Sequence, residues 1–133
     1  MDRGEALAEA AARVAAGFGE RFAAAVPLRR DRDLAPELAV EARPVVEALL
    51  AGARAAERID PGDGALREAV TLASLLGRRA AVLGATPTGA VAIAPCLVQA
   101  ASVEEARVEA LLEPLRAVCV EGYVAAREEA MAA

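Results

Sequence analysis

Two cysteines are the only side chains in this 133-residue chain suited to thiol chemistry. Cys96 and Cys119 each lie among aliphatic residues, and neither has a basic residue directly beside it. A buried thiol with no cation nearby stays protonated and packs like a small apolar side chain. We therefore expect both cysteines to be reduced packing residues, with redox sensing or ligand contact as the alternative.

The residue types that are missing exclude many catalytic and metal-binding arrangements. The chain contains no histidine and no lysine, which excludes a Ser-His-Asp triad, a histidine-ligated metal or haem, a Schiff base and a phosphate-loop lysine. Acidic neighbours such as Glu104 and Glu105, or Glu128 and Glu129, diverge around a helix rather than converge. The sequence therefore predicts a non-enzymatic protein with no cofactor and no metal site.

Arg78 and Arg79 form the basic pair of greatest interest, because they follow a long apolar segment and precede Gly84. Their charges suit the negative end of a helix. Alternatively, the two guanidinium groups bind an anionic group or the carboxylates of a partner protein. The pair is thus a candidate anion or partner contact.

A candidate ligand pocket lies between the helices expected near the C-terminus. Alanines and the prolines at 95 and 114 leave space between such helices. The pocket would take a small apolar ligand, such as a lipid or a tetrapyrrole. Its expected lining is Ile93, Leu97, Leu112 and Cys119.

Charge and hydropathy limit the partners and the location. A net charge of -5 argues against nucleic acid, which binds chiefly through excess positive charge. The N-terminus lacks a signal-peptide pattern, and two cysteines make no disulfide framework, so we expect a cytoplasmic protein. The uncharged stretch 80–103 approaches the length of a membrane span, but prolines, glycines and polar residues interrupt it. We expect no membrane segment.

The elements that position these residues are expected to be helices, because alanine dominates and no stretch alternates as a strand would. We predict a single all-α domain over 1–133, built as a bundle of five to six helices. The first predicted helix has about 23 residues, is capped by Asp2 and ends near Val26. The others are about 35–42, 44–58 and 64–84, one that starts at Thr86–Pro87, and a last one that opens at Ser102.

Several residue patterns mark where these helices begin and end. Asp2 with Glu5, and Ser102 with Glu105, have the spacing of a capping box. Gly84 suits a left-handed helix end, and Thr86 before a proline suits a helix start. Asp60 or Asp63 is expected to cap the next helix. The mixed-charge run 29–33 is expected to be a solvated connector.

Proline inside a helical pattern indicates an interruption. Pro44 is expected to separate two helices, and Pro95 to kink or divide the fifth. Pro114 is expected to kink the last helix, so the C-terminal helices should both be bent.

The predicted helix 64–84 has apolar residues on more than one face. Leu72, Leu75 and Val82 lie apart from its main apolar face, so we expect burial on more than one side. Gly77 inside this helix costs about 1 kcal/mol relative to alanine, which indicates a close helix crossing.

Residues 64–130 combine an arginine-rich helix end, a following glycine, a new apolar helix and a long last helix. The residues of this pattern are Leu76–Ala81, Gly84, Thr86–Pro87, Glu121–Tyr123 and Arg127–Glu129. In this pattern the stretch resembles the N-terminal non-haem globin domain of RsbR-type stressosome proteins. The family's last helix usually leads into a STAS domain, and none follows Ala133, so the resemblance implies a free-standing domain or a fragment.

The resemblance implies a globin-like bundle without haem that forms a homodimer. We therefore expect a bacterial stress-response sensor domain that signals through dimerisation and contacts with a partner protein. The alternative is a small apolar-ligand binding protein that uses the pocket named above.

Overall fold

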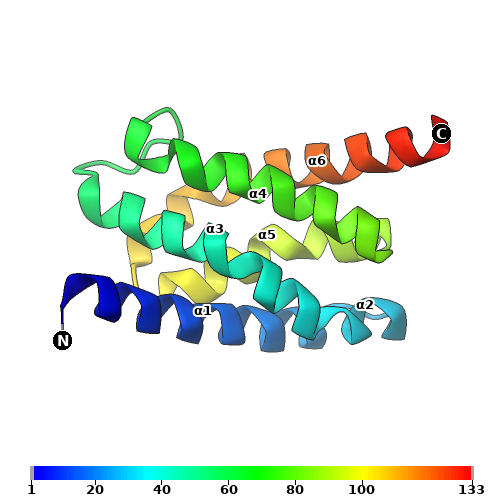
Figure 1. Ribbon diagram of the computed structural model, residues 1–133, viewed down its shortest axis with the longest axis horizontal. Coiled ribbons are helices and arrows are strands. Elements are labelled where there is room, and N and C mark those ends of the chain that lie inside the picture. The colour runs from blue at the N-terminus through cyan, green and yellow to red at the C-terminus, as the bar shows by residue number, and fades with distance from the viewer. Residues whose placement is uncertain (1, 133) are drawn as a thin grey trace.

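The computed structural model describes residues 2–132, which contain helices and no strand. This confirms the predicted all-α fold. Five long helices run roughly along the long axis of the molecule (Figure 1). They are α1 (Arg3–Ala25), α3 (Ala35–Ala55), α4 (Gly64–Leu83), α5 (Pro87–Ser102) and α6 (Leu112–Ala132). The short helix α2 (Arg29–Asp33) leads into α3, and a 3₁₀ helix, η1 (Ala106–Leu111), leads into α6.

The long helices surround one apolar core. Going round it, α1 packs against α3, α3 against α4, α4 against α6, α6 against α5, and α5 against α1. Phe18 and Phe22 of α1 are fully buried, with ring centroids 5.9 Å apart, and Leu, Val, Ile and Ala fill the remainder. Within residues 2–132, no helix has the length and apolar character needed to cross a bilayer.

Most predicted helix starts carry the expected caps. The Asp2 carboxylate accepts a hydrogen bond from the Glu5 amide at 2.7 Å, and Asp63 accepts one from the Ala65 amide at 2.8 Å. Gly84 ends α4 with a φ of 94°, the left-handed conformation that glycine tolerates best. The Thr86 hydroxyl caps α5 by accepting from the Gly89 amide at 3.1 Å.

The run 29–33 connects α1 to α3 with four of its five residues exposed, so the expectation of a solvated connector was wrong only for Asp31 and for the absence of a helix. These residues form helix α2, and Asp31 in its centre is fully buried. Its carboxylate accepts two hydrogen bonds from Thr86, one from the backbone amide at 2.9 Å and one from the hydroxyl at 2.5 Å. A carboxylate whose acceptor capacity is used in this way can be buried, which local charge content does not reveal.

Pro44 does not separate two helices, and Pro95 does not divide α5. Helix α3 runs without a break from Ala35 to Ala55, and α5 from Pro87 to Ser102. Pro44 removes one backbone hydrogen bond, to the carbonyl of Val40 four residues earlier. Pro44 and Val40 both lie on the exposed face of α3, where water can solvate that carbonyl.

The capping box expected at Ser102 does not form. Ser102 is the last residue of α5, and its hydroxyl donates back to the Gln99 carbonyl at 2.8 Å. The last helix begins ten residues later, at Leu112. Pro114 therefore occupies its first turn, where the missing amide costs no intrahelical bond, rather than kinking its interior.

Candidate interaction surface

Helix α4 is held in place by glycines at its contacts with α3 and α6. A Cβ at Gly77 would collide with the Cys119 carbonyl of α6, and one at Gly122 would collide with the Ser74 carbonyl of α4. On the other flank, a Cβ at Gly52 of α3 would collide with the Ala65 carbonyl. The close crossing predicted from Gly77 is confirmed. These contacts leave α4 little freedom to rotate or slide.

The outward face of α4 carries aliphatic side chains. Leu75 is 53% exposed and Val82 is 70% exposed, whereas Leu72 is partly buried against the core. The expectation that this second apolar face is buried was therefore wrong for Leu75 and Val82. Single exposed aliphatic residues are common, but two on one face of a fixed helix form a surface that can pack against a partner.

Arg78 and Arg79 flank these aliphatic residues and turn to opposite sides. Arg78 donates to Glu129 of α6 at 2.6 Å, and Arg79 donates to Glu41 of α3 at 3.2 Å. Both pairs are partly exposed, so each stabilises the fold by only about 0–1 kcal/mol. The two guanidinium groups do not converge on a single anion. They instead lie on either side of the aliphatic stripe.

The residues on this face of α4 follow one regular spacing along the helix. Glu68, Leu72, Leu75, Arg79 and Val82 follow one another at intervals of four and three residues, the spacing of a coiled-coil seam. Glu68 and Arg79 are exposed like Leu75 and Val82, and Leu72 is partly buried. We call these five residues the α4 stripe. The spacing is present in the sequence, but the nearby main apolar face of the same helix obscures it.

The four residues predicted to line a ligand pocket belong to the packed core. Ile93, Leu97 and Cys119 are at most 2% exposed, and Leu112 is partly buried against the same cluster. Five surface hollows of residues 2–132 are lined by other side chains. The structure thus brings the four together as packing residues, and their role in ligand binding stays a prediction.

Both cysteines are free and buried. Burial raises the pKa of the Cys119 thiol to about 12, so this thiol is protonated and unreactive near neutral pH. Burial also raises the pKa of Cys96, but the charge of Arg21 on α1 opposes the effect. Cys96 therefore has a cationic neighbour, contrary to the prediction from sequence, because α1 packs beside α5.

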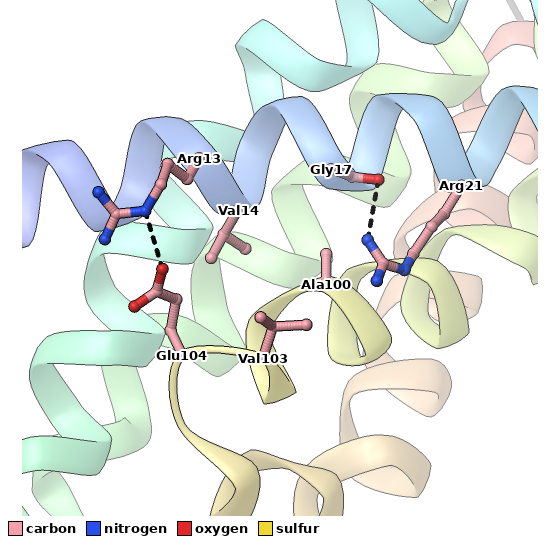
Figure 2. Close-up of a pocket in the computed structure, with 7 residues that line it drawn as sticks. All are labelled: Arg13, Val14, Gly17, Arg21, Ala100, Val103 and Glu104. Atoms are coloured by element: carbon pink, nitrogen blue, oxygen red, sulfur yellow. Dashed lines mark hydrogen bonds and ion pairs between the residues drawn. The ribbon is translucent and has the colours of Figure 1, made fainter.

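Two hollows lie along the contact between α1 and α5. One, of about 200 Å³, is lined by residues that include Val14, Gly17 and Val103 and is shown in Figure 2. The other, of about 380 Å³, is lined by three alanines together with Arg21, Pro95, Cys96 and Gln99. Arg21 borders both. No cluster of three or more cysteine and acidic side chains suited to a metal ion occurs within residues 2–132.

No protein-family model, curated protein or solved structure matches this chain.

Proposed function

We propose that this chain is a non-enzymatic sensory or regulatory domain that acts through homodimerisation and protein–protein contacts. The observation that supports this function best is the α4 stripe, in which Leu75 and Val82 are exposed on a helix that glycines fix in place. Protein interfaces combine a rigid apolar centre with arginine and other polar groups around it. Arg79 within the stripe and Arg78 beside it provide such polar groups.

The charges of the α4 stripe favour a second copy of the chain as the partner. When two α4 helices pack antiparallel about a two-fold axis, Leu72 of each copy lies opposite Leu75 of the other. The same register places Glu68 opposite Arg79 of the second copy, and Ala65 opposite Val82. The stripe is therefore complementary to itself in both shape and charge.

A globin-like relation without haem is part of the proposal. It is supported by the resemblance of residues 64–130 to the sensor domain of RsbR-type stressosome proteins and by the all-α fold. Cytoplasmic, bacterial stress-response signalling is the role that this relation suggests. Contacts with a further protein in a signalling complex would then involve faces other than the α4 stripe.

A charge-swap experiment tests the proposed dimer. We expect the wild-type chain to form a reversible dimer with a dissociation constant in about the micromolar range, because one helix per copy makes a small interface. Glu68→Arg and Arg79→Glu should each weaken the dimer at least about tenfold by opposing like charges. The double variant should restore it, as measured by sedimentation velocity over a range of concentrations.

The double variant also removes a structural ambiguity. Arg79→Glu breaks the ion pair with Glu41 within the chain, and that pair is still broken in the double variant. Restored dimerisation would therefore reflect the contact between copies. Glu47→Arg on α3, whose side chain pairs with Arg43 rather than with a residue of the stripe, is the matched control and should not change the dissociation constant. A chain that is monomeric at millimolar concentration contradicts homodimerisation, and a dimer unaffected by both single swaps contradicts the α4 register.

The second candidate function is binding of a small apolar ligand such as a lipid or a tetrapyrrole. The mainly apolar hollow of about 380 Å³ between α1 and α5 favours it. Native mass spectrometry of the purified chain separates the two functions. A co-purified ligand in stoichiometric amount supports ligand binding, and a bare dimer supports the regulatory function.

A further inference from the structure

Arg21 is the lining residue that the two hollows between α1 and α5 share. Its side chain is partly buried and borders both the hollow of about 200 Å³ and that of about 380 Å³. Figure 2 shows it leaning from α1 over the part of α5 that carries Ala100. The smaller hollow is also lined by Arg13 and Glu104, whereas Arg21 is the one charged residue that lines the larger hollow, and we call the two hollows together the groove.

Small residues keep this groove open. A Cβ at Gly17 would lie 3.8 Å from the Ala100 Cβ and 3.1 Å from the Arg21 guanidinium, so glycine leaves room for the arginine to lie flat. Beyond Arg21 the walls consist of Ala24, Ala25 and Ala92 with Pro95. None of these side chains is long enough to cover the hollow, and none competes with a ligand for the guanidinium.

The charge of Arg21 is poorly satisfied within the chain. Its one hydrogen bond runs from Nη1 to the Gly17 carbonyl at 3.5 Å, the outer limit for such a bond, and it makes no ion pair with residues 2–132. Arg13, eight residues earlier on α1, gives the contrast. It borders the same smaller hollow but donates to Glu104 at 2.9 Å.

We infer that the groove binds the carboxylate of a small aliphatic acid, with the head group on Arg21 and the alkyl tail over Ala24, Ala92 and Pro95. A guanidinium group pairs with a carboxylate through two parallel hydrogen bonds. Gln99, at the rim of the same hollow, adds an amide that can donate to the head group. One cation beside an apolar wall suits a monoanion with a tail better than a phosphate, which needs more donors.

This inference deepens the second candidate function, because it names the ligand class and the residue that selects it. It does not depend on the α4 stripe, which lies on a different helix. Cys96 lines the groove as well, so a bound carboxylate would offset the charge of Arg21 next to this thiol. The backbone amide of Cys96 is therefore a suitable local reporter of binding.

Titration with hexanoate, followed by amide chemical shifts in NMR spectra, tests the inference. We expect saturable shifts at residues of α1 and α5 around Arg21, and weaker binding of hexan-1-ol, which keeps the tail but lacks the charge. Arg21→Gln should weaken hexanoate binding about tenfold or more, because it removes a charge-assisted pair. Arg3→Gln, at an exposed position of α1 that lines neither hollow, is the matched control and should change the affinity by less than about twofold.

A second variant keeps the arginine and fills the apolar wall. Ala92→Leu should weaken hexanoate while leaving acetate, which has no tail, unchanged. Thermal melting followed by circular dichroism confirms that each variant is folded. Equal hexanoate affinity in the wild type and Arg21→Gln would overturn the inference, and so would the absence of saturable shifts. Equal binding of hexan-1-ol and hexanoate would also overturn it, but would leave apolar-ligand binding intact.

Discussion

Helix α4 and helix α5 are anchored to the bundle by opposite means. Where α4 crosses α6, Gly77 and Gly122 have no side chains, and the two backbones touch. Where α5 begins, the buried Asp31 carboxylate fills the space and accepts two hydrogen bonds from Thr86. The first anchor requires that Gly77 and Gly122 carry no side chain. The second requires the carboxylate of Asp31 as an acceptor for Thr86.

This difference predicts opposite sensitivities to substitution. A close backbone contact tolerates no added group, because the neighbouring backbone has no alternative position. Removing a buried, hydrogen-bonded carboxylate destabilises the fold, because the groups that donate to it would be left without partners. Each of the following substitutions tests one side of the comparison, and they are ordered by expected effect.

Gly77→Ala should have the largest effect, a destabilisation of about 3 kcal/mol. The new Cβ would collide with the carbonyl of Cys119 and push α6 away from α4. The measurement is chemical denaturation followed by circular dichroism. Gly64→Ala in the first turn of the same helix is the matched control, because nothing lies within 4 Å of its added Cβ. It should be neutral or stabilise by up to about 1 kcal/mol. Equal effects of the two substitutions would contradict the close crossing.

Asp31→Ala should destabilise by about 2 kcal/mol, because it leaves the amide and hydroxyl of Thr86 without their acceptor. Asp33→Ala, two residues along the same short helix, is the control. Asp33 is exposed and lies 3.7 Å from Arg29, so its loss should cost less than about 0.5 kcal/mol. Urea unfolding of both variants gives the comparison, and a ranking in the reverse order would show that the buried carboxylate does not anchor α5.

Tyr123→Phe should have the smallest effect, about 1 kcal/mol. The buried hydroxyl donates to the Ala85 carbonyl at 2.7 Å, so this contact supports the same turn as Asp31 through a single neutral bond. Arg127 donates to the same hydroxyl at 2.8 Å from an exposed position. Thermal unfolding should therefore show Arg127→Ala closer to wild type than Tyr123→Phe. The opposite order would mean that the arginine, rather than the tyrosine, holds the turn.

Helix boundaries governed by local hydrogen bonds were predictable from the sequence. Asp2, Gly84 and Thr86 each act on residues within a few positions, and all three behave as their residue types indicate. Gly77 could also be interpreted, because glycine inside an apolar helix has few reasons other than close packing. The all-α fold follows from the same local preferences and from the spacing of apolar residues.

Features that depend on distant contacts were not predictable in this way. The Ser102 pattern matches a capping box, but Glu104 binds Arg13 of α1 and Glu105 binds Arg107, so neither acidic side chain is left to cap a helix. Asp31 lies in a highly charged run, yet Thr86 makes its burial favourable. At the candidate site, Arg78 and Arg79 were identified, whereas exposure of Leu75 and Val82 depends on where α3 and α6 cover α4.

The link between Asp31 and Thr86 also bears on the order of folding. Its two ends are 55 residues apart in the chain, so this contact forms only after the segment that contains α3 and α4 has closed into a loop, whereas the cap between Thr86 and Gly89 is local. Helix α5 has no charged residue of its own and gains little from starting alone. The contact between Asp31 and Thr86 therefore adds to α5 a hydrogen-bonded tie that local sequence cannot supply, and it links the N-terminal helices to the C-terminal half of the chain.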